Sequence, residues 1–157
     1  MEAKSNSLHF LTSNDWALIR DKSRELKFHK DQWIIQEGLI GSTLYVLKSG
    51  RARVERVSAS KSVRIATLEP GDVCGEMAFI EKGKASASVV ADEDVTAEAL
   101  DTATLSTLFE SFPHVGARFF RSLALILSQR LRTTSAELAK ARATIDPRSR
   151  STANPPP

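Results

Sequence analysis

The stretch LEPGDVCGEMAFI, at residues 68–80, is the most informative part of this sequence. Its Pro-Gly-Asp segment ends a β-rich run, and Gly75 then precedes a short helical segment that starts with Glu76. Pro-Gly-Asp favours a tight turn because proline presets its own φ and glycine accepts a positive φ. Glycine before a helix also lets another backbone or a ligand come close. The stretch therefore predicts a strand, a turn and a short helix.

A second glycine-rich stretch, GLIGSTLYVLKSG at residues 38–50, lies upstream. Two glycines bracket a turn, an apolar strand follows, and Gly50 turns the chain back. Other short β-rich runs surround these stretches, and together the runs cover residues 26–28, 33–35, 44–47, 52–57, 63–68, 89–91 and 95–100. Many short strands separated by turn residues predict a sandwich or barrel, the class that includes jelly rolls.

Helical patterns flank the β-rich region on both sides. Before it, Ser13 or Asn14 is placed to cap a short helix. After Asp101 a short helix is expected to end at Pro113, because proline disrupts a helix interior. A longer helix is then predicted from about residue 114 to about residue 143.

The longer helix carries an apolar stripe suited to pairing with a second helix. Its members step by four and three residues, at Phe120, Ala124, Leu127, Leu131, Thr134, Leu138, Ala141 and Ile145. This heptad spacing predicts a homodimer through the C-terminal helix. The side chains assigned to the dimer are Phe120, Leu127, Leu131 and Leu138. A single helix lying on its own domain is the alternative. It explains the first half of the stripe well, but it explains Leu131, Leu138 and Ile145 less well.

Composition limits the classes of protein to which this chain can belong. Its 157 residues, 41% of them hydrophobic, suit one domain with a sizeable core. A single cysteine, Cys74, excludes an internal disulfide and fits a reducing compartment; it is expected to be a packing residue rather than a nucleophile. No signal peptide and no apolar run near the ~18 residues of a membrane span are present, so a soluble cytoplasmic protein is expected.

The chain is divided by composition into three parts. Residues 1–11 form a polar N-terminal segment, and residues 12–143 form the domain with its C-terminal helix. Residues 144–157 are rich in Ser, Arg and Pro, so we expect a disordered tail or linker. The formal net charge of +3 is modest, and basic residues on the long helix are interpreted as a solvated face rather than a nucleic-acid surface.

Together with ASASV at residues 85–89, the two glycine-rich stretches resemble the cyclic nucleotide-binding domain family, which includes the catabolite activator protein and protein kinase A regulatory subunits. The resemblance extends over roughly residues 10–143. It implies a mainly β fold, a double-stranded β-helix or jelly roll, with a short N-terminal helix, a short cassette helix and a long C-terminal helix. It also implies a regulatory module, not an enzyme, whose ligand is a cyclic nucleotide (cAMP or cGMP) or a related phosphorylated nucleoside.

The resemblance implies a ligand site as well. In the family a Gly-Glu-x-Ala segment opens the helix of a phosphate-binding cassette, and free N–H groups at a helix start attract an anion. Glu76 is interpreted either as the acceptor of a ribose hydroxyl or as a first-turn carboxylate that serves the helix dipole. The residues assigned to the ligand are Gly75, Glu76, Met77, Ala78, Ala85, Ser86, Ala87, Thr134 and Ser135.

One position departs from the family pattern. Members that bind cyclic nucleotides usually carry an arginine ten residues after the cassette glycine, and here Ala85 stands there. A charge-assisted hydrogen bond of this kind contributes roughly 1.5–3 kcal/mol, so its loss costs on the order of ten- to a hundredfold in affinity. Lys84 precedes that position, but neighbouring strand residues point to opposite faces. Ser86 can still donate its hydroxyl to a phosphate.

Two interpretations of the long helix and of the function stay open. Thr134 and Ser135 resemble the Thr-Ser pair with which the two subunits of a catabolite-activator-type dimer reach the purine, yet Thr134 can equally be a polar residue that sets helix register. The alternative function is a degenerate domain without a nucleotide, kept for dimerisation or protein-partner binding. No cofactor, metal spacing or catalytic constellation is identified, and too few residues follow the helix for a helix-turn-helix, so DNA binding is not expected.

Overall fold

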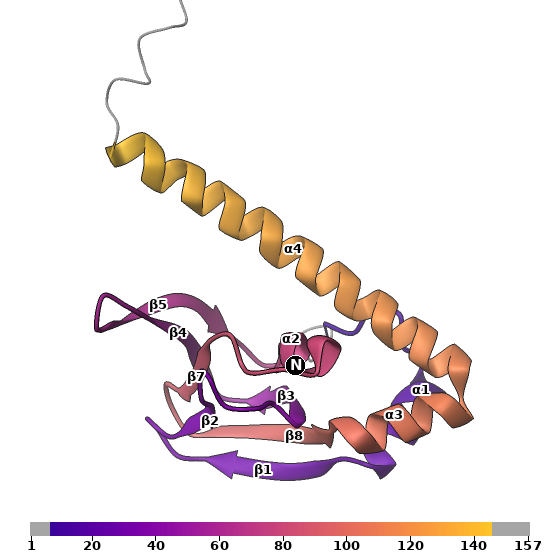
Figure 1. The fold of residues 1–157 in the computed structure, drawn as a ribbon. Coiled ribbons are helices and arrows are strands. Elements are labelled where there is room, and N and C mark those ends of the chain that lie inside the picture. Colours follow the sequence, from indigo (N-terminus) through magenta and orange to yellow (C-terminus); the bar gives the residue numbers. More distant parts are fainter. Residues whose placement is uncertain (1–6, 146–157) are drawn as a thin grey trace, which may run out of the picture. The chain divides into compact units, whose positions relative to one another are not determined.

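The computed structural model describes residues 7–145 (Figure 1). Its elements, in chain order, are α1 (Ser13–Asp21), β1 (Arg24–Phe28), β2 (Trp33–Ile35), β3 (Thr43–Ser49), β4 (Ala52–Ser58), β5 (Lys61–Leu68), β6 (Val73–Cys74), α2 (Glu76–Glu81), β7 (Ser88–Ala91), β8 (Val95–Asp101), α3 (Thr102–Ser111) and α4 (Pro113–Ile145). The predicted disordered tail lies outside the described residues except for residues 144 and 145, which continue α4.

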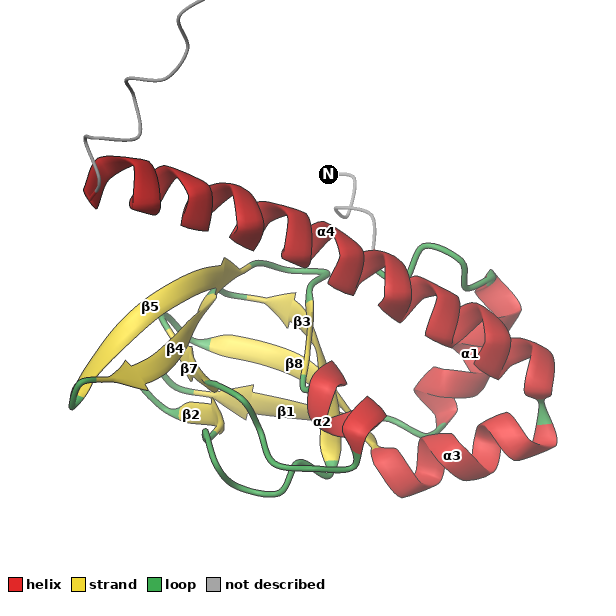
Figure 2. Cartoon of the chain, turned by 45° about the horizontal axis from the view of Figure 1, so that its top comes forward, coloured by secondary structure: helices red, strands yellow, loops and turns green. Residues whose placement is uncertain are grey.

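The strands form two four-stranded antiparallel sheets, which Figure 2 shows in yellow. One sheet has the order β1-β8-β3-β6 and the other β2-β7-β4-β5, so strands adjacent in a sheet are mostly distant in sequence. This is the jelly roll that the sequence predicts. Every run predicted as a strand lies inside an observed one, whereas the two-residue strand β6 was not predicted.

The core lies between the two sheets because alternate side chains of each strand point inward. In the central pair β3 and β8, Leu44 pairs with Leu100 and Leu47 with Ala97, and all four side chains are buried. Cys74, the small packing residue expected from the sequence, is buried in one core cluster. That cluster comprises Ile34, Leu47, Ala52, Leu68, Cys74, Val89, Ala91, Val95 and Ala97.

Helix α1 begins one residue earlier than its predicted caps allow. The N-cap is Thr12, not Ser13 or Asn14, and it forms a capping box with Asp15. The Thr12 hydroxyl accepts from the Asp15 N–H at 3.2 Å, and the Asp15 carboxylate accepts from the Thr12 N–H at 2.9 Å. The reciprocal pair satisfies two N–H groups at once, which explains why Thr12 prevails over two neighbours that also cap helices.

The segment before α1 is anchored to residues far along the chain. Leu8 is buried, and the N–H of Phe10 donates to the hydroxyl of Ser122 at 3.0 Å. The guanidinium of Arg121 lies 4.0 Å from the centre of the Phe10 ring, a favourable cation–π distance. These contacts join the N-terminal segment to the first turns of α4.

Helix α4 passes through two compact units, of which the first ends at Ser122 and the second begins at Leu123. In the second unit Leu123 and Ile126 are buried, whereas every residue from 131 to 145 is exposed. Among residues 7–145, no helix is both long and apolar enough to cross a lipid bilayer.

Candidate ligand-binding site

The cassette predicted from the sequence begins at Gly75, the N-cap of α2. Its backbone is left-handed, with φ of 86°, and a Cβ there would lie 2.7 Å from the carbonyl oxygen of Thr43. Both facts oppose any residue larger than glycine. A left-handed backbone strains an L side chain, and the Thr43 oxygen that a Cβ would meet is part of the β3 backbone. Gly75 therefore lets the start of α2 lie directly against the sheet.

The first turn of α2 alternates buried and exposed side chains. Glu76 and Ala78 are buried, while Met77 is 41% exposed. Burial of a carboxylate is uncommon and demands polar partners. Because an ionised carboxylate only accepts hydrogen bonds, Glu76 is chemically suited to a ligand hydroxyl.

The segment after α2 pairs with the loop between β2 and β3. The N–H of Ala85 donates to the Leu39 carbonyl at 2.8 Å, and the Ala85 carbonyl accepts from the N–H of Gly38 at 2.9 Å. Both backbone groups of Ala85 are therefore committed within the protein. The same loop approaches α2 closely, since a Cβ on Gly41 would lie 2.5 Å from that of Ala78.

Ser86, in the segment after α2, contacts Met77, on α2, within the predicted cassette. Its hydroxyl donates to the Met77 sulfur at 3.5 Å, and both side chains are exposed. A thioether is a weak acceptor, so a stronger anionic acceptor can replace it. Met77, on the cassette helix, and Ser86, on the segment after it, are therefore in contact at the protein surface, whereas Glu76 and Ala78 lie beneath it.

An aromatic cluster connects the cassette helix with α3 and α4. The ring of Phe79, on α2, stacks on Phe120 with centres 5.7 Å apart and meets Phe119 edge-on at 5.9 Å. Phe109, on α3, lies 4.9 Å from Phe119 and 5.8 Å from Phe120. Aromatic pairs at these distances are favourable, so a displacement of α2 acts directly on the first turns of α4.

The sequence profile described as "Cyclic nucleotide-binding domain" matches residues 25–112, more than half of the chain. The chain belongs to the cyclic nucleotide-binding domain family.

Known relatives of this cyclic nucleotide-binding domain are longer proteins. The chain is 36% identical over 106 residues to the cyclic AMP receptor protein of Thermus thermophilus, covering 67% of this chain and 47% of that protein. It is 28% identical over 123 residues to cyclic GMP-binding protein C of Dictyostelium discoideum, covering 78% of this chain and 5% of that protein. The chain therefore spans less than half of each of these two relatives.

A solved structure agrees with the same fold. The catabolite activator protein of Thermus thermophilus superimposes with a TM-score of 0.73 at 29% identity, over 88% of this chain and 63% of that one. The relation to the catabolite activator group that the sequence motifs indicate is confirmed.

This cyclic nucleotide-binding domain has alanine at position 85, so no guanidinium is present there. The cationic side chains of Lys84, Lys82 and Arg53 do not take its place. Lys84 is exposed and forms a β-bridge with Ile40, and Lys82 is exposed in a left-handed conformation at the end of α2. Arg53, on β4, is engaged elsewhere: its guanidinium bonds to Asp92 at 2.8 Å. Its other carboxylate partners are Asp31 and Glu55. The hydrogen bond from Arg53 holds the pKa of Asp92 below its usual range.

The residues predicted to contact the base or to form the dimer lie on α4, and all of them except Phe120 belong to the second compact unit. Thr134 and Ser135 are exposed there, and their contact with a purine stays a prediction. Among the predicted dimer residues, Leu131 and Leu138 are exposed and Leu127 is half-buried. Phe120 differs from them, because it packs in the aromatic cluster of its own chain.

Phe79 is a residue of functional interest that the sequence pattern did not single out. An apolar residue three positions after Glu76 suits the buried side of any short helix, so its partners cannot be read from the sequence. Within residues 7–145, no group of three or more His, Cys, Asp or Glu side chains is arranged to hold a metal ion.

Proposed function

We propose that this chain is a regulatory module that binds a cyclic nucleotide, or a related phosphorylated nucleoside, at its cassette and signals through α4. The observation that carries the proposal is the double role of α2. This helix starts at Gly75 and Glu76, which face the ligand in the proposal, and it packs through Phe79 on α4. A ligand with higher affinity for one position of α2 therefore shifts α4 as well.

The chemical class of the ligand is supported from two sides. Two relatives bear names that refer to cyclic AMP and cyclic GMP. The cassette offers a carboxylate at Glu76 for ribose and a hydroxyl at Ser86 for phosphate. Met77 and Ala78 supply backbone N–H groups of the first helical turn, and Ala87 lies next to Ser86. The absence of arginine at position 85 makes the proposed affinity weaker than in members that have it.

The proposed output is a change in the pairing of α4 with a second copy. Leu131, Leu138 and Ile145 are 68%, 52% and 82% exposed and follow one another at heptad spacing. Large apolar side chains repeated along one helix stripe are typical of a coiled-coil seam. In such a dimer Thr134 and Ser135 would reach the base of the ligand.

The second candidate function is a degenerate domain that dimerises or binds a protein partner without any nucleotide. It is favoured by Ala85, whose backbone groups are bonded to the Gly38–Leu39 loop and whose side chain offers no charge. In that case the buried Glu76 carboxylate serves the fold, and only the α4 stripe carries function.

Calorimetric titration of the purified chain with cyclic AMP, then cyclic GMP, at near-physiological salt separates the two functions. Saturable binding in the micromolar range supports the nucleotide module. No heat at millimolar nucleotide, from a chain that is folded and dimeric, contradicts it and favours the degenerate domain.

Variants of α2 locate the bound nucleotide. Glu76→Ala should weaken binding at least tenfold, since it removes a charged hydrogen-bond acceptor. The matched control is Glu81→Ala, which removes an exposed carboxylate at the other end of the same helix. Equal affinities of the two variants would exclude the cassette as the site, provided that circular dichroism shows both folded.

A further inference from the structure

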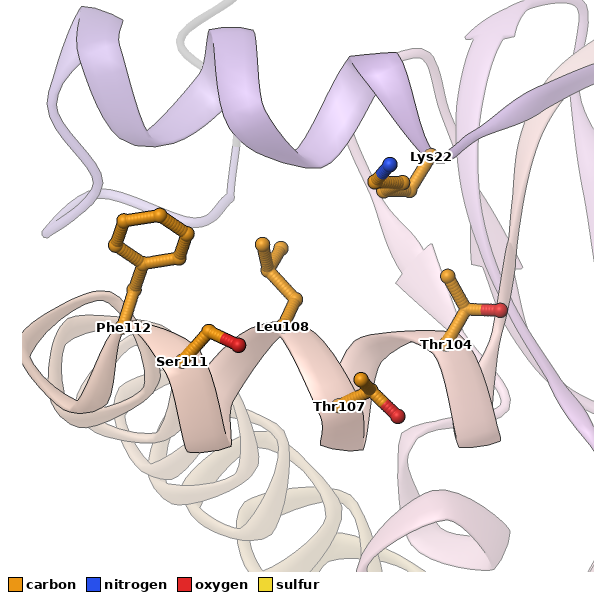
Figure 3. A pocket seen from close by; sticks show the side chains of 6 residues that line it. All are labelled: Lys22, Thr104, Thr107, Leu108, Ser111 and Phe112. Carbon is orange, nitrogen blue, oxygen red and sulfur yellow. The ribbon is translucent and has the colours of Figure 1, made fainter.

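A hollow of about 380 Å³ lies between the end of α1 and α3, outside the cassette (Figure 3). It is lined by Lys22, Thr104, Thr107, Leu108, Ser111 and Phe112. Its volume falls within the range of roughly 300–1,000 Å³ that small-molecule sites occupy. None of the residues assigned to the nucleotide contributes to it.

One continuous stripe of α3 forms the floor of the hollow. Thr104, Thr107, Leu108 and Ser111 follow one another at helical spacing, so their side chains share a face. Figure 3 shows the side chains of Leu108 and Phe112 rising from α3 toward α1. Leu108 is buried, whereas the Phe112 side chain stays 37% exposed at the rim. The hollow therefore has an apolar centre that a hydrocarbon or aromatic body can cover.

A positively charged side chain, that of Lys22, lines the hollow on the side opposite α3. The ammonium of Lys22, the C-cap of α1, lies 3.3 Å from the carboxylate of Asp21. Both side chains are at least half exposed, and exposed ion pairs contribute little free energy. Lys22 can therefore exchange Asp21 for the carboxylate of a ligand at small cost.

The hydroxyl groups of Thr104 and Thr107 offer a ligand hydrogen-bond acceptors rather than donors. The Thr104 hydroxyl donates to the Asp101 carboxylate at 3.0 Å, and the Thr107 hydroxyl donates to the Ala103 carbonyl at 3.2 Å. Each hydroxyl has one proton, so the remaining capacity of these oxygens is to accept. A ligand hydroxyl is a matching donor.

We propose that this hollow is a second small-molecule site, which takes a carboxylic acid with an apolar or aromatic body and a hydroxyl group. Its carboxylate pairs with Lys22, its body covers Leu108 and Phe112, and its hydroxyl donates to a threonine oxygen. Such a ligand bridges α1 and α3, so it would fix these two helices relative to each other.

The site can be tested with 4-hydroxyphenylacetate as the probe, by following backbone amide NMR signals of the full chain. We expect saturable shifts at Lys22 and along 104–112, with millimolar or tighter affinity. Lys22→Met should weaken binding about tenfold, the contribution of a charge-assisted bond. The matched control Lys27→Met, an exposed lysine on β1, should leave affinity unchanged.

Two comparisons make the result decisive. The alcohol 4-hydroxyphenethyl alcohol has the same body without the carboxylate, so it should bind about tenfold more weakly to the unaltered chain and equally weakly to the Lys22→Met variant. Glu76→Ala should not alter binding of the acid, which separates this site from the cassette. Absence of saturable shifts at these amides, or equal affinities of acid and alcohol, would overturn the proposal.

Discussion

Arg118 holds Asp15 in a bidentate ion pair, with Nε 2.6 Å from Oδ2 and Nη2 2.7 Å from Oδ1. The Asp15 side chain is only 3% exposed, and the same carboxylate completes the capping box of α1. One buried carboxylate thus joins α1 to the first turns of α4, the helix that carries the proposed signal.

This ion pair predicts acid sensitivity. The hydrogen bond from Arg118 is the main reason why the pKa of Asp15 is lowered from 3.8 to about 2. A carboxyl group with a depressed pKa in the folded state stabilises the protein above its unfolded pKa and loses that contribution as pH falls toward the folded value. The free energy of unfolding should therefore decrease between about pH 4 and pH 2. Urea unfolding followed by circular dichroism at a series of pH values measures this.

Asp15→Asn should remove this part of the pH dependence and cost about 2 kcal/mol at neutral pH. Asp21→Asn, at an exposed position of the same helix, should change little, because exposed charges contribute little. An unaltered acid profile in the Asp15→Asn variant would show that another carboxyl group controls acid unfolding.

A second prediction concerns the glycine that starts α2. Gly75→Ala should destabilise the chain by more than ~1 kcal/mol and weaken any nucleotide binding, because the left-handed backbone and the Thr43 oxygen both oppose a Cβ. Gly83→Ala is the control, since a Cβ there meets nothing closer than 3.9 Å. Thermal unfolding of the two variants is the measurement, and comparable melting temperatures would contradict the close approach of α2 to β3.

A third prediction tests whether the cassette lacks only its arginine. Ala85→Arg should increase affinity for cyclic AMP about ten- to a hundredfold if the rest of the pocket is intact. Lys84→Arg provides the control, because it places a guanidinium one residue away, at the exposed position that forms the β-bridge with Ile40. Isothermal titration calorimetry of both variants with cyclic AMP is the measurement. An unchanged affinity of the Ala85→Arg variant would mean that the pocket has lost more than one contact.

The exposed stripe of α4 gives a fourth prediction. Leu131→Asp and Leu138→Asp should convert the proposed dimer into monomers without unfolding the β-sheets, because a charge in a coiled-coil seam is costly and both residues are exposed in the single chain. Ala136→Asp adds the same charge off the stripe and should leave the dimer intact. Sedimentation equilibrium measures the masses, and a wild-type chain that is monomeric at all concentrations would refute the dimer.

Most of the fold could be predicted because its signals are local. Glycines and apolar runs in the sequence indicated where the longer strands lie, and Gly75 with Glu76 indicated the start of α2. Strand β6 was missed because two residues carry no periodicity, and Thr12 was missed as the cap because Ser13 and Asn14 serve the same purpose.

What could not be predicted depends on contacts between distant residues. Phe79 meets Phe119 and Phe120 only after the sheets and helices have packed. The hollow between α1 and α3 combines Lys22 with residues more than eighty positions later. No sequence period connects such residues, so the second proposed site was visible only in three dimensions.

The anchoring of the N-terminal segment also dictates an order of assembly during synthesis. Phe10 and Asp15 leave the ribosome early, but their partners Ser122 and Arg118 follow 112 and 103 residues later. Contacts that close such long loops form slowly, since the entropy of closure is lost before the contact forms. Helix α1 is therefore translated before α4 and can make these contacts only after α4 has emerged, so its apolar side must be kept from aggregating in the interval.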